Sequence, residues 1–241
     1  MITFDFSDFE KLAKSLDNVE RQMPFVLSYA LNNAMKDAKA AEEKKMREVF
    51  DRPTTYTMTA IKIDWSSKTN LRATLRFKDQ SFKGTPADKF LAPEVYGGAR
   101  HQKATERQLI RNGFMKPGEF IVPGQGVKLD AHGNIRGNVF TEILSGLGIA
   151  TDAHQNRTKA SKKRNKKLKP FFVLRGTKAA NGVYMRKGRK AVPILIFVRS
   201  PSYKPRYPFY DVGRQVLRPA MQRHFDYAVE HYIIKDTKRR A

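Results

Sequence analysis

The chain has 241 residues, no cysteine and a formal net charge of +24, from 47 Lys or Arg residues against 23 Asp or Glu residues. The absence of cysteine excludes disulfide frameworks, thiolate metal sites and cysteine nucleophiles, and it fits a chain made in a reducing cytoplasm. No apolar run approaches the roughly 18 to 20 residues that span a bilayer, and the N-terminus lacks the pattern of a secretory signal, so we expect no membrane contact.

The positive charge is concentrated in one part of the sequence. Between Ala153 and Tyr210 there are 17 Lys or Arg residues and no Asp or Glu, whereas the rest of the chain contributes only +7. A positive field focused on one region attracts phosphate backbones or acidic protein surfaces. Charge therefore indicates binding and assembly rather than catalysis.

The N-terminal part is predicted to be helical over residues 8–50. Apolar residues recur there at steps of three and four, first from Phe9 to Val19 and then from Phe25 to Phe50. Pro24 suits the first turn of a second helix, where its missing N–H group is tolerated. We expect a long amphipathic helix packed on a sheet, with an exposed oligomerisation helix as the alternative.

The next elements are shorter. Thr54 or Thr55 is a candidate cap for a short helix, and apolar residues then alternate with polar ones over 61–65 and 71–77. The polar linker 66–70 between them predicts a β-hairpin with a longer loop.

The middle of the chain predicts mixed structure. Residues 103–112 are expected to form a helix that ends at Gly113, and residues 118–126 a strand and turn. Asn134 is expected to cap a further helix that runs to Leu147.

Residues 156–169 are polar, strongly basic and free of aromatics, so we expect a mobile loop or arm there. Strands are predicted over 171–175, 183–186 and 192–198, the last apolar enough to be central in a sheet. The Pro-rich segment 200–208 should resist regular structure.

The C-terminal part is predicted to be one long helix from Phe209 to Ile234. Pro219 should kink this helix or divide it, and the tail 235–241 should be disordered. The element order gives an α+β class, with an antiparallel sheet of the hairpin plus the C-terminal strands packed by a long N-terminal and a long C-terminal helix. We expect a single domain over 1–241, with an inserted middle region at about 84–150 and a mobile basic loop at about 151–169.

The residue types that usually carry chemistry form no recognisable site. None of the five histidines has another histidine three or four residues away, and the carboxylates are scattered. The glycine-containing segments 96–98 and 124–126 do not have the spacing of phosphate-binding loops. We therefore expect no enzymatic activity, no metal and no cofactor.

The basic segment allows three interpretations: a loop facing a lumen, nucleic acid or an acidic neighbour; a sequence-specific DNA reader; or a merely solvated loop. No DNA-reading motif stands near it, and sparse aromatics argue against base stacking. The candidate contact residues are Arg157, Lys159, Lys162, Lys163, Arg164, Lys166, Lys167, Lys169, Lys187, Arg189 and Lys190.

Two segments, 28–63 and 182–225, resemble tailed-phage structural proteins of the minor tail protein Z or tail-completion (neck) type. The resemblance lies in an alanine- and asparagine-containing helix and in a strand with a Gly-Arg and Pro-Ile pattern. The middle segment 84–137 is similar to prophage-encoded proteins. The matching positions are Ala30, Asn32 or Asn33, Ala34, Gly188, Arg189, Pro193 and Ile194.

The resemblance implies a virion protein at the head–tail junction, assembled in the host cytoplasm. Such proteins form rings, often of six subunits, that join or seal the tail and the portal-side connector or adaptor around the DNA channel, where non-specific DNA contact is expected. The alternative is a cytoplasmic nucleic-acid-binding protein that contacts phosphates through residues 156–190. A phage-encoded hydrolase would need clustered acidic or histidine residues, which the sequence does not show.

Overall fold

The computed structural model describes residues 2–5, 21–82, 84–164, 169–199 and 202–234. The predictions for 8–20, for Lys166 and Lys167 and for the tail 235–241 lie outside the described residues. The chain divides into two compact units, one formed by 1–96 with 205–241 and the other by 97–204. The sequence predicted one domain with an insertion at about 84–150, whereas the second unit extends to Lys204 and includes the C-terminal strands.

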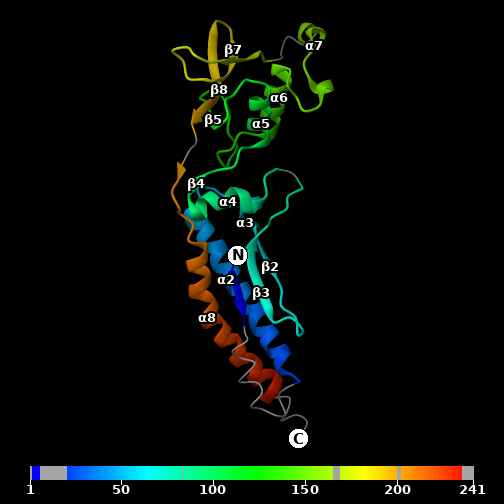
Figure 1. Cartoon of the computed structure of the whole chain (residues 1–241), viewed down its shortest axis with the longest axis vertical. Helices are drawn as coiled ribbons and strands as arrows, with labels where there is room; N and C mark the ends of the chain where they lie inside the picture. Colours follow the sequence, from blue (N-terminus) through cyan, green and yellow to red (C-terminus); the bar gives the residue numbers. More distant parts are fainter. Residues whose placement is uncertain (1, 6–20, 83, 165–168, 200–201, 235–241) are drawn as a thin grey trace. The chain divides into compact units, whose positions relative to one another are not determined.

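In its described residues, the first unit has two long helices, a small sheet and two short helices (Figure 1). Helices α2 and α8 run antiparallel, and the antiparallel sheet, in the order β1-β3-β2, contacts α2. Its elements are β1 (Ile2–Asp5), α2 (Met23–Val49), α3 (Thr55–Met58), β2 (Ile61–Asp64), β3 (Arg72–Phe77), α4 (Ala87–Tyr96), α8 (Phe209–Ala228) and the π-helical turn η2 (Val229–Ile234).

Helix α2 is the centre of this unit, as its sequence period predicts. Pro24 occupies its first turn, and the stripe that includes Leu27, Leu31 and Met35 is at most 1% exposed. Ala34 and Ala38 are equally buried in the same core as the apolar face of α8. Small side chains at these positions let the two helix backbones approach closely, so the alanines here are packing residues.

The predicted hairpin is confirmed as β2 and β3, with Ile63 opposite Leu75. Strand β1, which was not predicted from the sequence, pairs with the other side of β3 and places Ile2 opposite Leu75. Thr54 is the confirmed cap of α3, since its hydroxyl accepts a hydrogen bond from the backbone N–H of Thr57.

A carboxyl group is buried where α2 meets the start of α8. Glu42 is fully buried, and one of its oxygens accepts a hydrogen bond of 2.7 Å from the Tyr207 hydroxyl. Its other oxygen, Oε1, is buried without a hydrogen-bond partner. Desolvation therefore outweighs the hydrogen bonds from Tyr207 and the backbone of Gly213, and it raises the pKa of Glu42 to about 7.

We expect Glu42 to make the stability of the first unit pH-dependent. Because its pKa rises from 4.5 to about 7 on folding, the stabilisation is complete below pH 4.5 and is lost as the pH rises to 7. At about 1.4 kcal/mol per pH unit, the free energy of unfolding should fall by about 3 kcal/mol across this window. In Glu42→Gln, this decline should disappear from denaturant titrations. Glu48→Gln, which removes an exposed carboxyl from the same helix, should retain it; an unchanged decline in Glu42→Gln would contradict the assignment.

The second unit has a four-stranded antiparallel sheet in the order β5-β8-β7-β6 and a separate two-stranded pair, β4-β9. Its core lies between one face of the sheet and helices α5 and α6, with Leu109, Ile143, Val183 and Leu195 fully buried. The elements are β4 (Gly98–Ala99), α5 (Ala104–Arg111), β5 (Glu119–Pro123), α6 (Gly137–Leu147), η1 (Ala153–Gln155), α7 (Lys159–Arg164), β6 (Phe171–Leu174), β7 (Gly182–Lys187), β8 (Lys190–Arg199) and β9 (Ser202–Tyr203).

The α+β class is confirmed, with antiparallel sheets and the long N-terminal helix packed on the long C-terminal one. The hairpin β2-β3 and the C-terminal strands, however, belong to separate sheets rather than to one. Strand β8 is central, as its apolar sequence predicts, because it lies between β5 and β7. Pro219 lies inside α8 without dividing it.

Two local predictions for the second unit were wrong. Asn134 does not cap α6, because Arg136 occupies the cap position; the Asn134 backbone instead closes a turn with Asp130.

The segment 156–169 is not simply a loop or extended arm, because Lys159–Arg164 form helix α7 and Arg157 is packed against the unit. Local polarity predicted an arm, but contacts with α6 order its flanks.

Candidate functional site: the cationic second unit

The second unit carries most of the charge of the protein. Residues 97–204 contain 23 Lys or Arg residues and five Asp or Glu residues, a net charge of +18 out of +24. Of the 17 basic residues between Ala153 and Tyr210, 16 belong to this unit and Arg206 belongs to the first; residues 97–152 add seven further cations to the second unit. A body with this charge creates a strong positive potential at its surface.

One of the five carboxylates is buried in a closed network. Glu106 is fully buried and accepts two hydrogen bonds, of 2.5 and 2.8 Å, from the Arg100 guanidinium. It also accepts the backbone N–H groups of Lys103 and Ile121. Burial alone would raise the pKa of Glu106, but the hydrogen bonds from Arg100 and the two backbone groups prevail and lower it. The network joins the start of α5 to strand β5.

The other four carboxylates are also engaged inside the unit. Glu119 accepts two hydrogen bonds from the Arg175 guanidinium, and these hydrogen bonds lower the pKa of Glu119. Asp130 and Asp152 accept backbone N–H groups in their own turns. Glu142 binds Arg157 and Lys169. In the described part of the unit, only four basic residues have carboxylate partners, so its other described cations are available to water or to an external anion.

The tip of the β7-β8 hairpin gathers several cations that have no carboxylate partner among the described residues. Lys187 and Lys190 are direct cross-strand neighbours, joined by the two-residue turn Gly188–Arg189, in which Gly188 takes a φ of 61° that favours glycine. Arg186 extends the group, with its guanidinium 5.8 Å from the Phe172 ring centroid. All four cations are exposed, and like charges placed directly opposite destabilise a hairpin, so this arrangement favours an anionic ligand.

The structure separates the candidate contact residues into different environments. Lys187, Arg189 and Lys190 lie together at the hairpin tip, and Lys163 and Arg164 are exposed on α7. Lys159 and Lys162 belong to the same helix, but their side chains are outside the described part, as are Lys166 and Lys167 entirely.

Arg157 and Lys169 hold the basic segment to the second unit. Arg157 is only 9% exposed; it donates to Glu142 and to the Lys169 carbonyl, and its guanidinium lies 5.6 Å from the Phe171 ring centroid. The Lys169 ammonium group also binds Glu142, at 3.1 Å. These two residues therefore position the ends of the segment through α6.

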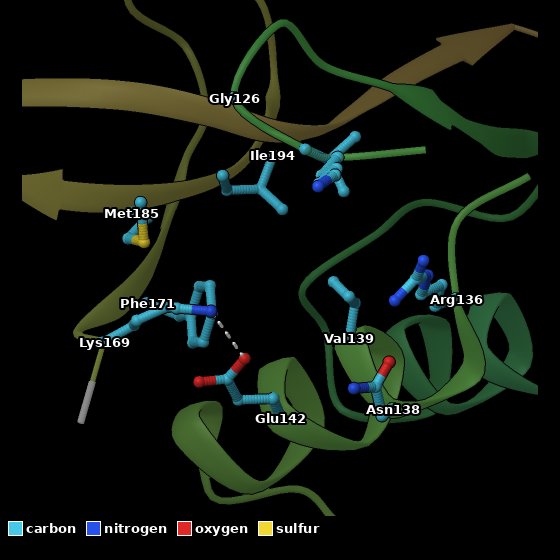
Figure 2. Close-up of a pocket in the computed structure, with 11 residues that line it drawn as sticks. Gly126, Arg136, Asn138, Val139, Glu142, Lys169, Phe171, Met185 and Ile194 are labelled. Atoms are coloured by element: carbon cyan, nitrogen blue, oxygen red, sulfur yellow. Dashed lines mark hydrogen bonds and ion pairs between the residues drawn. The ribbon is translucent and has the colours of Figure 1, made fainter. Parts of the chain in front are cut away.

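A pocket of about 270 Å³ lies beside α6, between the loop after β5 and strands β6, β7 and β8 (Figure 2). Val139, Phe171, Met185 and Ile194 form its apolar part, and Lys128, Arg136 and Lys169 are the cations that line it. A wider hollow of about 880 Å³ shares Asn138 and Glu142 with this pocket.

Three cations of these sites, Arg186, Lys128 and Arg136, are not among the contact residues predicted from the sequence. Arg186 directly precedes Lys187 in the sequence, and this adjacency was the signal that could have indicated it. Lys128 and Arg136 lie outside the basic stretch, on either side of a turn closed by an isolated bridge from Leu129 to Ile135. Only the tertiary fold brings them to the pocket.

Among the residues that the structure describes, no three His, Asp or Glu side chains gather closely enough to hold a metal ion. No helix in the described ranges is long and apolar enough to cross a bilayer.

Comparisons of the chain with protein-family models, with curated proteins and with solved structures found no match. The resemblance to phage tail-completion proteins therefore stays a prediction.

Proposed function

We propose that this chain is a structural protein of a tailed-phage virion, a tail-completion or neck protein without enzymatic activity. In this role it forms a ring, of six subunits in the pattern of such proteins, that joins or seals the tail and the head connector around the DNA channel. The resemblance of residues 28–63 and 182–225 supports this role. The observation that carries the proposal is the segregation of +18 onto the second unit, whose five carboxylates are all engaged internally.

Ring symmetry would turn this unit into a continuous band of positive charge. Such a band needs an anionic neighbour, which at a head–tail junction is either DNA in the channel or an acidic rim on the adjoining ring. Contacts of this kind to phosphates position a protein without reading sequence. The exposed hairpin tip, with Arg186, Lys187, Arg189 and Lys190, is the part of the unit best suited to this contact.

Purified protein and purified particles test the proposal together. Negative-stain images of the protein should show rings with a countable number of subunits, and mass spectrometry should find the chain in mature particles of the phage that encodes it. A chain that is consistently missing from mature particles would contradict the virion assignment, whatever its behaviour in isolation.

The hairpin tip also favours a second candidate, a cytoplasmic nucleic-acid-binding protein that contacts phosphates through residues 156–190. Both candidates expect non-specific DNA binding, but only a cytoplasmic binder requires tight binding by the isolated subunit. The affinity of the single subunit and the presence of the chain in virions therefore discriminate between them.

Salt dependence should identify the phosphate contacts. Each neutralised phosphate adds about −0.9 to the slope of log affinity against log salt, so replacing Lys187, Arg189 and Lys190 by Gln should reduce the magnitude of the slope by about 3. The control replaces Arg111, Lys116 and Lys178 by Gln, which removes the same charge from exposed positions elsewhere in the second unit. Equal losses in both variants would show that the tip is not the contact.

A further inference from the structure

The pocket beside α6 has an apolar floor that is part of the packed core of the second unit. Ile194 is 3% exposed and belongs to the core of the second unit, and Val139, Phe171 and Met185 pack against that core. A floor continuous with a packed core is largely pre-formed, and a volume of about 270 Å³ suits one large apolar side chain. In Figure 2 these side chains surround the pocket; they come from α6 and from three strands of the sheet.

The mouth of the pocket is cationic. Lys128 and Arg136 are exposed, and within the described residues neither forms an ion pair with a carboxylate, although the Asp130 carboxyl is close enough to interact electrostatically with Arg136. The one carboxylate in the lining, Glu142, is already bound to Lys169 at 3.1 Å and to Arg157 at 3.3 Å (Figure 2 shows the pair with Lys169). A ligand at the mouth therefore meets net positive charge.

The neighbouring hollow is suited to an extended chain. It shares the lining residues Asn138 and Glu142 with the pocket, and hydroxyl, amide and guanidinium groups, including those of Thr141, Ser161 and Arg164, line the rest of it. An apolar pocket beside a broad polar trough fits a peptide with a single buried anchor and polar flanks.

We propose that this pocket and trough bind an acidic segment of another protein, through one large apolar side chain flanked by carboxylates. The apolar side chain fills the space between Val139, Phe171 and Ile194, and the carboxylates meet Lys128 and Arg136. Charge complementarity selects what enters the pocket: a unit with a net charge of +18 disfavours a basic segment there, such as one from the same unit of another copy, and attracts an acidic chain. The site is distinct from the hairpin tip and does not depend on what the tip binds.

Nucleic acid fits this pocket less well than a peptide. A nucleobase has polar edges that need hydrogen bonds when they leave water, whereas the floor consists of aliphatic, aromatic and thioether groups. An unpaired buried polar edge costs more than the stacking on Phe171 would return. Nucleic acid should therefore prefer the open hairpin tip.

Fluorescence anisotropy with the full chain tests the proposal. The probe is a labelled peptide with one central Phe flanked on each side by two acidic residues, and its matched control has Ser in place of Phe. Removing the anchor should weaken binding by about tenfold to a hundredfold, the effect of burying one large apolar side chain. Equal binding of both peptides would overturn the proposal, because the pocket would then contribute nothing.

Two charge-reversal variants locate the binding. Lys128→Glu with Arg136→Glu should weaken the Phe peptide at least about tenfold, whereas Lys187→Glu with Arg189→Glu should leave it within about twofold. Both pairs are exposed and change the net charge equally, so diffuse attraction would affect them alike and would contradict the assignment. A labelled oligothymidylate should show the reverse order; if it responds to the pocket pair as the peptide does, the site is a nucleic-acid site instead. A loss of oligothymidylate binding without any change in peptide binding would concern the hairpin tip and not the pocket.

Discussion

Glu106→Ala should lower the free energy of unfolding of the second unit by about 3 to 5 kcal/mol, the usual cost of breaking a buried ion pair from one side. The substitution leaves the Arg100 guanidinium, only 16% exposed, without its carboxylate partner. It also removes the acceptor for the backbone N–H groups of Lys103 and Ile121. Hydrogen exchange of the amides in α5 and β5, measured in the full chain, would report the loss directly.

Glu119→Ala is the matched control, because it breaks a more accessible Arg–Glu pair in the same unit. Partial exposure to water reduces the energy of such a pair, so the control should lose clearly less stability. A double variant, Arg100→Met with Glu106→Leu, should recover part of the loss, since apolar residues of similar volume replace the two charges. Equal losses for Glu106→Ala and Glu119→Ala would mean that water reaches the Arg100–Glu106 pair.

Leu31→Ala should destabilise the first unit by about 2 to 5 kcal/mol, the range measured for buried leucines. Leu31 is 1% exposed on the stripe of α2 that faces the core shared with α8 and the sheet. Loss of the side chain removes its apolar burial and leaves a cavity, because a close-packed core relaxes only partly around a truncated side chain.

Denaturant titrations of Leu31→Met and Lys36→Ala are the controls for this prediction. Leu31→Met preserves the volume and should cost less than about 1.5 kcal/mol. Lys36→Ala changes an exposed residue on the same helix and should stay within about 0.5 kcal/mol. If Leu31→Ala is as stable as Lys36→Ala, the stripe does not support the subunit core.

The sequence was sufficient for elements whose pattern is local. The apolar period of α2, the alternation in β2 and β3 and the apolar run of β8 all led to the observed elements. Each of these patterns is fixed by neighbours a few residues away, because one buried face imposes a period of 3.6 or two. The turn at Gly188 and the cap at Thr54 could be anticipated for the same reason.

Long-range contacts decided what the sequence could not indicate. Strand β1 forms because Ile2–Asp5 pair with β3, which is distant in the sequence. Asn134 was expected to cap α6, but its backbone N–H donates to Asp130 in a turn instead. The division into two units also follows from packing, since the hairpin and the C-terminal strands join different sheets. The apolar period of a segment does not indicate which strand it will pair with.

The candidate site shows the same division between local pattern and tertiary contact. Charge density alone identified the hairpin tip, because Lys187, Arg189 and Lys190 are close in sequence and a two-residue turn keeps them together. It did not distinguish them from Arg157 and Lys169, which the fold turns toward Glu142. Composition by itself determined that this protein is strongly cationic, and the order of its predicted elements indicated the α+β class. Only the tertiary structure decided which cations are matched, because a carboxylate neutralises the charge that lies beside it in space, however far away that residue is in the sequence.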